Sequence, residues 1–235
     1  MNLKCIIFDV DGTMADTERD GHRVAFNLAF KEKNLDWQWD EELYGKLLKV
    51  TGGKERMKYY QTDFLNKQLL TDDEIKGMHA CKTKHYVRLL ESGKIPLRQG
   101  VERLIKQAKS ENIRLAISTT TTPINVSTLL KSTLGNNAEQ LFDVIAAGDI
   151  IPNKKPAPDI YYYALINLGL KATECIAIED SSAGLASSVQ AGIKTIVTTN
   201  LYTENQDFSK AEVIYPNFSQ INVQSLNQLI GQNHV

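Results

Sequence analysis

The feature that most constrains the fold is a series of apolar, β-branched runs, each followed by polar or glycine-containing residues. These runs are Cys5–Phe8, Ile113–Ile117, Val144–Ala147, Cys175–Ile178 and Thr195–Val197. Near-continuous apolarity is typical of strands buried on both faces, as in a parallel sheet. Helical patterns separate the later runs, so the alternation predicts a doubly wound α/β sheet of parallel strands.

One long segment, from about Asp16 to Gly93, interrupts this alternation with several helical patterns and no convincing strand. Within it, Thr71 and Glu74 predict a capping box at the start of a long helix. The segment begins just after the first strand, and we expect both of its connections to the core to lie close to that strand. This arrangement predicts a helical lid over the end of the first strand. The predicted domains are a core of residues 1–15 and 94–235 and an inserted all-helical cap of residues 16–93.

Composition narrows the classes of function. A formal net charge of −1 over 235 residues argues against a dedicated nucleic-acid surface, which needs a basic excess. Three widely separated cysteines, Cys5, Cys81 and Cys175, show neither a disulfide framework nor a zinc spacing. The N-terminus does not resemble a signal peptide, and no apolar run is long enough to span a bilayer. We therefore expect a cytoplasmic, monomeric protein with no membrane or nucleic-acid partner.

Two aspartates, Asp9 and Asp11, follow the first apolar run directly and precede Gly12. Carboxylates at the tip of a buried strand are held rigidly, so one can attack a substrate while the other handles a proton. Together they can also bind a hard cation through oxygen. An Asp-Gly pair after a strand is also common in ordinary turns, so the functional reading depends on the other strand ends.

Polar side chains follow three later runs as well. Ser118 and Thr119 offer hydroxyls before a helix, where they could bind an anion or simply cap the helix. Lys155 precedes Pro156 in a proline-stiffened loop, with Lys154 as the adjacent alternative. Two acidic residues, Glu179 and Asp180, directly follow the fourth run. Asp180 could simply cap the next helix, but that role would leave Glu179 unexplained.

The carboxyl ends of parallel strands meet at one edge of a sheet, where open α/β proteins bind ligands. The chain places an oxygen nucleophile, a proton carrier, carboxylates for magnesium and donors for non-bridging oxygens at that edge. This set of groups suits phosphoryl transfer.

These motifs, in this order, resemble the haloacid dehalogenase (HAD) superfamily phosphatases that carry a helical cap after the first motif. The resemblance implies a Rossmann-like HAD core and Mg²⁺ as cofactor. It implies that Asp9 attacks phosphorus to form an aspartyl-phosphate, and that Asp11 protonates the leaving alcohol and then activates water. Mg²⁺ would be held by Asp9, the Asp11 backbone carbonyl and Asp180, with Glu179 as a ligand or an outer partner. Ser118, Thr119 and Lys155 would bind the phosphoryl oxygens.

The cap resembles that of the CbbY-type phosphatases, which act on xylulose bisphosphate, and the β-phosphoglucomutases share the same core. The substrate-binding cap residues that this resemblance suggests are Glu18, His22, Lys49, Gly53, Lys54, Arg56 and Lys82. Basic residues on a cap helix could instead form a solvated face, and His22 could be an ordinary surface histidine. We expect a phosphatase acting on a small phosphorylated sugar, with a sugar phosphomutase as the alternative and a non-catalytic binding protein as a weaker third.

Overall fold

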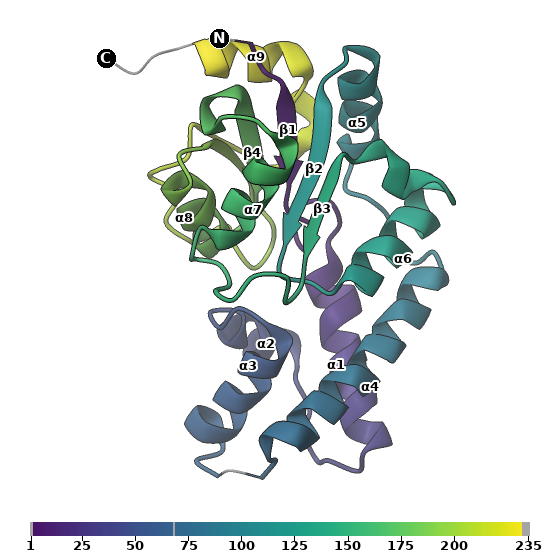
Figure 1. Ribbon diagram of the computed structural model, residues 1–235. Helices are drawn as coiled ribbons and strands as arrows, with labels where there is room; N and C mark the ends of the chain where they lie inside the picture. Colours follow the sequence, from purple (N-terminus) through teal and green to yellow (C-terminus); the bar gives the residue numbers. More distant parts are fainter. Residues whose placement is uncertain (1, 68, 232–235) are drawn as a thin grey trace. The chain divides into compact units, whose positions relative to one another are not determined.

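The computed structural model describes residues 2–67 and 69–231. Within these residues, six parallel strands form one sheet in the order β3-β2-β1-β4-β5-β6 (Figure 1). The strands are β1 (Cys5–Phe8), β2 (Arg114–Thr119), β3 (Val144–Ala147), β4 (Cys175–Glu179), β5 (Lys194–Thr198) and β6 (Val213–Tyr215). Strands β2 and β3 follow one another on one side of β1, and β4, β5 and β6 follow one another on its other side. The predicted doubly wound fold is therefore confirmed, and β1 marks the point of reversal where such sheets bind ligands.

The register of β1 against its two neighbours brings three strand ends together. Phe8 pairs with Ile117 of β2 and with Ile178 of β4. Because all three strands run in the same direction, the residues that follow these pairs lie at one edge of the sheet. Those following residues are Asp9, Ser118 and Glu179.

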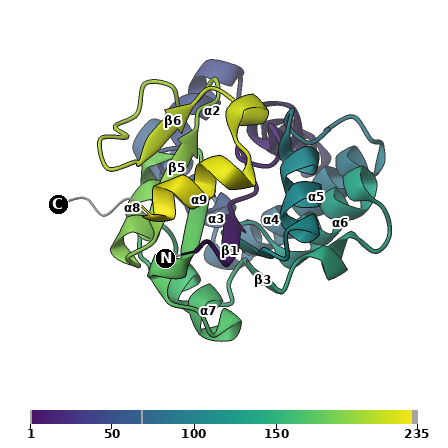
Figure 2. The same ribbon diagram turned by 90° about the horizontal axis from the view of Figure 1, so that it is seen from above.

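Helices cover both faces of this sheet. On one face, α7 (Asp159–Leu168) contributes Ile160 and Tyr161 to a buried cluster that also contains Cys5 and Cys175. Figure 2 shows α9 (Val223–Gly231) on the opposite side of β1 from α7, and α9 contacts α5 (Val101–Ser110). Two further helices begin shortly after strand ends, α6 (Pro123–Leu134) after β2 and α8 (Ser182–Gln190) after β4. Strands buried between two helical layers explain the continuous apolar runs.

The described residues divide into two compact units, one comprising residues up to Asp16 and from Pro96 onward, the other Thr17–Ile95. The second unit contains helices and no strand among its described residues. Its elements are a π-helical turn (Glu18–His22), α1 (Arg23–Glu32), α2 (Glu41–Leu47), α3 (Gly53–Tyr59), a second π-helical turn (Tyr60–Phe64) and α4 (Asp72–Glu91). An aromatic cluster forms its core, with the rings of Phe26 and Trp39 4.7 Å apart. The predicted capping box of Thr71 and Glu74 is present at the start of α4.

The end of strand β2 differs from the sequence prediction. Strand β2 continues two residues beyond the apolar run because Ser118 and Thr119 pair with Ala146 and Ala147 of β3. Among the described residues, no helix combines the length and apolarity needed to cross a membrane.

Candidate functional site

The ammonium group of Lys155 joins the ends of three strands. Its Nζ donates hydrogen bonds to Asp9 Oδ1 at 2.7 Å, to the Ser118 carbonyl oxygen at 2.8 Å and to Glu179 Oε1 at 2.6 Å. All of these residues are buried, and Asp9 and Lys155 are each only 6% exposed. The structure thus brings together residues that are 146 positions apart in the chain, around one buried positive charge.

The alternative lysine, Lys154, lies elsewhere. Its Nζ is 3.2 Å from Asp149 Oδ1, in a partly exposed ion pair after β3. The two neighbouring lysines therefore have different environments, and Lys155 is the one that reaches the acidic residues.

Burial has the largest effect on the pKa values of Asp9 and Asp180. Burial raises the pKa of Asp9 to about 7, with the Lys155 charge opposing this shift and the Glu179 charge adding to it. Burial also raises the pKa of Asp180 well above its usual value, as do the charges of Asp9 and Glu179. For Lys155, burial lowers the pKa, but the carboxylates of Asp9 and Glu179 outweigh that effect and the net shift is upward. Lys155 is therefore a fixed cation beside acids whose negative charge is only partly compensated.

The three acids fit a hard divalent cation. One carboxylate oxygen each from Asp9, Glu179 and Asp180 lies within 4.8 Å of the others. Glu179 Oε2 is buried and has no hydrogen-bond partner among the described residues, although Tyr161 donates its hydroxyl hydrogen to Oε1 of the same residue. An all-oxygen donor set with an unpartnered buried oxygen and excess negative charge is what Mg²⁺ prefers.

Asp180 does not cap the helix that follows it. The N-cap of α8 is Ser181, whose side chain accepts a hydrogen bond from the Gly184 backbone N–H. Asp180 instead accepts a hydrogen bond at Oδ2 from Asn200 Nδ2, at 2.7 Å. The capping alternative is wrong for this residue, so its buried carboxylate belongs to the acidic cluster.

The hydroxyl groups at the end of β2 differ from one another. Ser118 Oγ is buried and has no hydrogen-bond partner in the described structure. Thr119 Oγ1 accepts a hydrogen bond from the Thr121 backbone N–H at 3.3 Å. The N-cap of α6, Thr122, makes no side-chain capping bond. Ser118 is therefore the hydroxyl that is available to donate to a bound anion, whereas Thr119 organises the loop.

Two glycines are required by how closely the chain approaches the acidic cluster. Gly12 has a φ of +85°, and a Cβ there would lie 2.2 Å from Asp180 Oδ2. The partly exposed Asp11 immediately precedes it, and the Gly12 N–H donates to the Ala15 carbonyl at 2.8 Å. A Cβ at Gly184 would lie 1.9 Å from Glu179 Oε2. Both backbones pack directly against a carboxylate, so neither position has room for a side chain.

Gly184→Ala is expected to lower the free energy of unfolding by about 1–3 kcal/mol, because the added methyl group forces the Glu179 carboxylate to move. The matched control is Gly77→Ala in α4, where a Cβ would meet nothing within 4 Å. That substitution is expected to stabilise the protein by about 0.5–1 kcal/mol, since alanine favours a helix. Urea unfolding of both variants checks the prediction, and equal effects of the same sign would contradict it.

The sequence did not assign a supporting role to three residues, Tyr161, Asn200 and Arg98. Tyr161 and Asn200 hold Glu179 and Asp180, as described above. Arg98 Nη1 donates to the Gly12 carbonyl at 2.6 Å, and its Nη2 donates to the Thr199 carbonyl at 2.6 Å. Arg98 therefore joins the loop after β1 to the loop after β5. No local pattern marks these roles, because each residue acts on a partner distant in sequence.

Several cap residues are held by contacts within their own unit. Arg56 Nη1 donates to the Tyr44 hydroxyl at 2.7 Å, and that hydroxyl donates to Glu18 Oε2 at 2.5 Å. Lys82 Nζ is 2.6 Å from His22 Nδ1. Arg56, His22 and Lys82 are buried, so neither a solvated face nor a surface histidine describes them.

The remaining cap candidates have different surroundings. Lys49 is exposed and its Nζ lies 4.6 Å from the centre of the Tyr59 ring, while Lys54 is partly exposed. A Cβ at Gly53 would lie 2.8 Å from the His79 ring, so packing inside the cap by itself accounts for this glycine.

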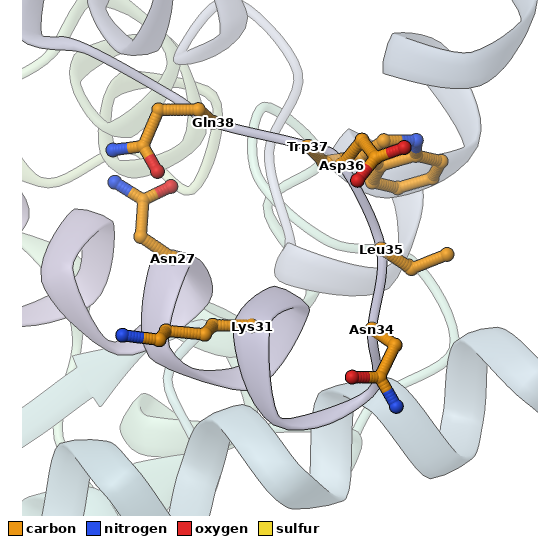
Figure 3. Close-up of a pocket in the computed structure, with 7 residues that line it drawn as sticks. All are labelled: Asn27, Lys31, Asn34, Leu35, Asp36, Trp37 and Gln38. Atoms are coloured by element: carbon orange, nitrogen blue, oxygen red, sulfur yellow. The ribbon is translucent and has the colours of Figure 1, made fainter.

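A hollow of about 390 Å³ lies in the cap, next to the connection between α1 and α2 (Figure 3). The residues that line it are Asn27, Lys31, Asn34, Leu35, Asp36, Trp37 and Gln38. The Asn27 side chain is already bonded to the Trp39 backbone, through its Oδ1 and its Nδ2. None of the predicted site residues lines this hollow.

Comparisons with known proteins agree with this geometry. Residues 6–198 match the family model of haloacid dehalogenase-like hydrolases. Protein CbbY of Rhodobacter capsulatus is 46% identical over 97% of this chain and 100% of its own length. A plasmid-encoded CbbY of Cupriavidus necator is 43% identical over 91% of this chain and 85% of its own.

Solved structures show the same similarity. CbbY from Rhodobacter sphaeroides, crystallised with phosphate, superimposes with a TM-score of 0.86 at 41% identity, covering 93% of this chain and 96% of the other. An Asp-to-Asn mutant of that protein, crystallised with xylulose-(1,5)bisphosphate, gives the same values. A β-phosphoglucomutase from Clostridium difficile, at 22% identity and a TM-score of 0.79, shares the fold. The chain therefore belongs to the haloacid dehalogenase-like hydrolases and is a phosphatase of that family.

Proposed function

We propose that this protein is a Mg²⁺-dependent phosphatase that hydrolyses a small sugar phosphate or bisphosphate, of the xylulose-1,5-bisphosphate type, through an aspartyl-phosphate. The observation that carries the proposal is the buried meeting of Asp9, Lys155 and Glu179, with the unpartnered Ser118 hydroxyl at the end of the neighbouring strand. The co-crystallisation of a 41% identical relative with xylulose-(1,5)bisphosphate supports this substrate class.

In the proposed mechanism, an Asp9 carboxylate oxygen attacks phosphorus and the bond to the sugar oxygen breaks. Asp11 donates its proton to that leaving oxygen. Asp11, now a carboxylate, then takes a proton from water, and the resulting hydroxide attacks phosphorus to release phosphate and regenerate Asp9. Each proton transfer by one positioned carboxyl group contributes roughly 10²–10⁴-fold to the rate.

Ser118 Oγ and Lys155 Nζ would donate hydrogen bonds to the non-bridging phosphoryl oxygens, where negative charge develops. Asp9, Glu179, Asp180 and the Asp11 backbone carbonyl would hold Mg²⁺. When bound, the ion neutralises charge on the phosphoryl group and on the buried acids. Tyr161 and Asn200 orient two of these carboxylates and so keep the site ordered.

We further propose that the cap residues recognise the sugar and, in a bisphosphate, its second phosphate. Arg56 and Lys82 are the best candidates among them, because each is buried and held by named partners within the cap. A guanidinium fixed by the Tyr44 hydroxyl is suited to a phosphate group, since little side-chain freedom is lost on binding.

A screen of mono- and bisphosphorylated pentoses and hexoses tests this function. We expect Mg²⁺-dependent phosphate release that is fastest with xylulose-1,5-bisphosphate, is lost on chelation and returns when Mg²⁺ is added back. Lys155 compensates only part of the negative charge of these carboxylates, which explains the expected loss. Isomerised sugar phosphate in excess of free phosphate would instead identify a mutase. A folded protein inert toward the whole panel with Mg²⁺ present would refute the proposal.

A further inference from the structure

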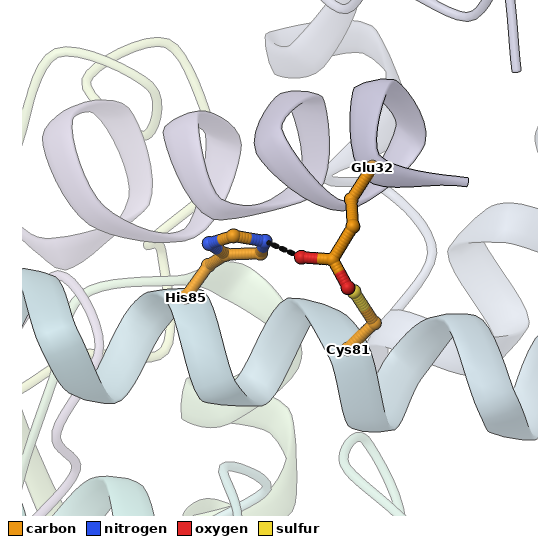
Figure 4. Close-up of side chains that lie close together, drawn as sticks. All are labelled: Glu32, Cys81 and His85. Carbon is orange, nitrogen blue, oxygen red and sulfur yellow. Dashed lines mark hydrogen bonds and ion pairs between the residues drawn. The ribbon is translucent and has the colours of Figure 1, made fainter. Parts of the chain in front are cut away.

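A second group of ligating side chains lies between α1 and α4 of the cap. Cys81 and His85 are one turn apart on α4, and Glu32 is the last residue of α1. One ligand atom from each residue lies within 4.8 Å of the other two. His85 Nε2 is 2.8 Å from Glu32 Oε2, and Figure 4 shows the Cys81 sulfur beside the other oxygen of that carboxylate.

We propose that Glu32, Cys81 and His85 form a binding site for a divalent transition-metal ion, with Zn²⁺ as the reference ion. One sulfur, one imidazole nitrogen and one carboxylate oxygen make a borderline donor set, which suits Zn²⁺ and does not suit Mg²⁺. The acidic cluster of the other unit contains only oxygen donors. The two clusters therefore select different metals, and this second site does not depend on the proposed phosphatase reaction.

The range of exposure among the three ligands supports a held but accessible ion. Cys81 is 6% exposed, while the side chains of His85 and Glu32 are 15% and 54% exposed. Spacing of four residues puts Cys81 and His85 on one face of a rigid helix, so two ligands are already positioned. The exposed side of the carboxylate leaves the fourth coordination position to water, as in zinc sites with three protein ligands.

The charges and protons balance on binding. The thiolate and the carboxylate together neutralise the two charges of the ion. The Cys81 thiol proton passes to solvent. The hydrogen that joins His85 Nε2 to Glu32 in the free protein must leave Nε2 by exchange with solvent, so that the imidazole binds the metal through Nε2 and carries its proton on Nδ1. The gap between His85 Nε2 and Glu32 Oε2 would widen from 2.8 Å to about 3.4 Å, the separation of two ligands in a tetrahedral zinc site.

Lys33 and Lys84 are the nearby cations, and both lower the pKa of Cys81. Burial and the hydrogen bond to Glu32 raise it by more, so the net pKa shift of the thiol is upward. The metal must therefore displace a proton from Cys81, as thiol ligands generally require. A bound ion would join the end of α1 to the middle of α4 and stabilise the cap in proportion to its occupancy.

The test is metal binding by the purified full-length protein with excess Mg²⁺ present to fill the acidic cluster. We expect one Zn²⁺ per chain by competition with a chromogenic chelator, and a thiolate-to-metal charge-transfer band when Co²⁺ replaces Zn²⁺. Cys81→Ser should abolish that band. Cys81→Ser and His85→Gln should each weaken Zn²⁺ binding by at least about tenfold to a hundredfold, the loss that removal of an outer partner already causes.

Matched controls separate this site from general effects on folding. Cys175→Ser removes a thiol in the core unit and Glu91→Gln removes a carboxylate from the exposed end of α4, and both should bind Zn²⁺ as the native protein does. Zn²⁺ should raise the Tm of the native protein and of both controls, but not that of Cys81→Ser. Absence of binding at micromolar Zn²⁺, or a charge-transfer band that survives in Cys81→Ser, would overturn the proposal.

Discussion

Asp9→Asn is expected to abolish phosphate release, with a loss in kcat on the order of 10⁴–10⁶, the range seen when one member of a catalytic triad is removed. The amide of asparagine is nearly isosteric with the carboxylate, but it cannot attack phosphorus. The measurement is phosphate release at saturating Mg²⁺ with the best substrate from the screen.

The variant should still fold. Because burial raises the pKa of Asp9 in the folded protein to about 7, the ionised carboxylate destabilises the fold above the pKa of the unfolded chain. A neutral asparagine removes that cost, so the Tm without metal should be unchanged or higher. This outcome separates loss of chemistry from loss of structure.

Asp149→Asn is the matched control, because it is the same substitution just beyond the end of β3. Asp149 is 64% exposed at its side chain and pairs with Lys154. Its replacement should leave kcat within about twofold, since exposed ion pairs contribute little. Persistent full activity of Asp9→Asn would rule out the proposed nucleophile.

Lys155→Met is expected to have the second largest effect, on stability as well as activity. Removal of the buried ammonium leaves Asp9 and Glu179 buried without a compensating charge, which costs about 3–5 kcal/mol of unfolding free energy. Methionine keeps most of the side-chain volume, so a cavity does not account for the loss. Loss of a donor to the phosphoryl group should also lower kcat by roughly 10²–10³-fold.

Lys154→Met provides an adjacent comparison. Its ammonium pairs with an exposed carboxylate, so we expect a change of less than about 0.5 kcal/mol and little effect on kcat. Urea unfolding without metal measures both variants. Saturating Mg²⁺ should restore part of the stability of Lys155→Met, because the ion supplies positive charge to the same acids. Equal stabilities for the two variants would contradict the role assigned to Lys155.

Much of the core fold could be predicted from sequence because its signals are local. Strands β1 and β3 match the predicted runs, and β4 extends its run by one residue to include Glu179. A continuous apolar run indicates a strand that is covered on both faces. This pattern can be recognised without knowing which strands lie beside it. The end of β2 was misjudged because Ser118 and Thr119 are polar, yet they pair with β3.

Only some residues of the candidate site could be predicted from the sequence. Motif residues are visible because they directly follow the apolar strand runs or lie in a proline-rich loop. The supporting residues are not visible in this way, because Tyr161 comes from the first turn of α7 and Asn200 from the loop after β5. The number and spacing of cysteines also do not reveal the group of Glu32, Cys81 and His85, because this group contains a single cysteine. Glu32 also lies on a different helix from the other two residues.

The sequence by itself determined the alternation of strands and helices, the polar residues that follow the apolar runs and therefore the class of chemistry. Only the tertiary structure decided which polar residues meet. The pairing of Phe8 with both Ile117 and Ile178 brings Asp9, Ser118 and Glu179 to one edge, and Lys155 then joins them. Strand identity is set by neighbouring residues along the chain, whereas contacts between distant residues depend on the order and register of the whole sheet.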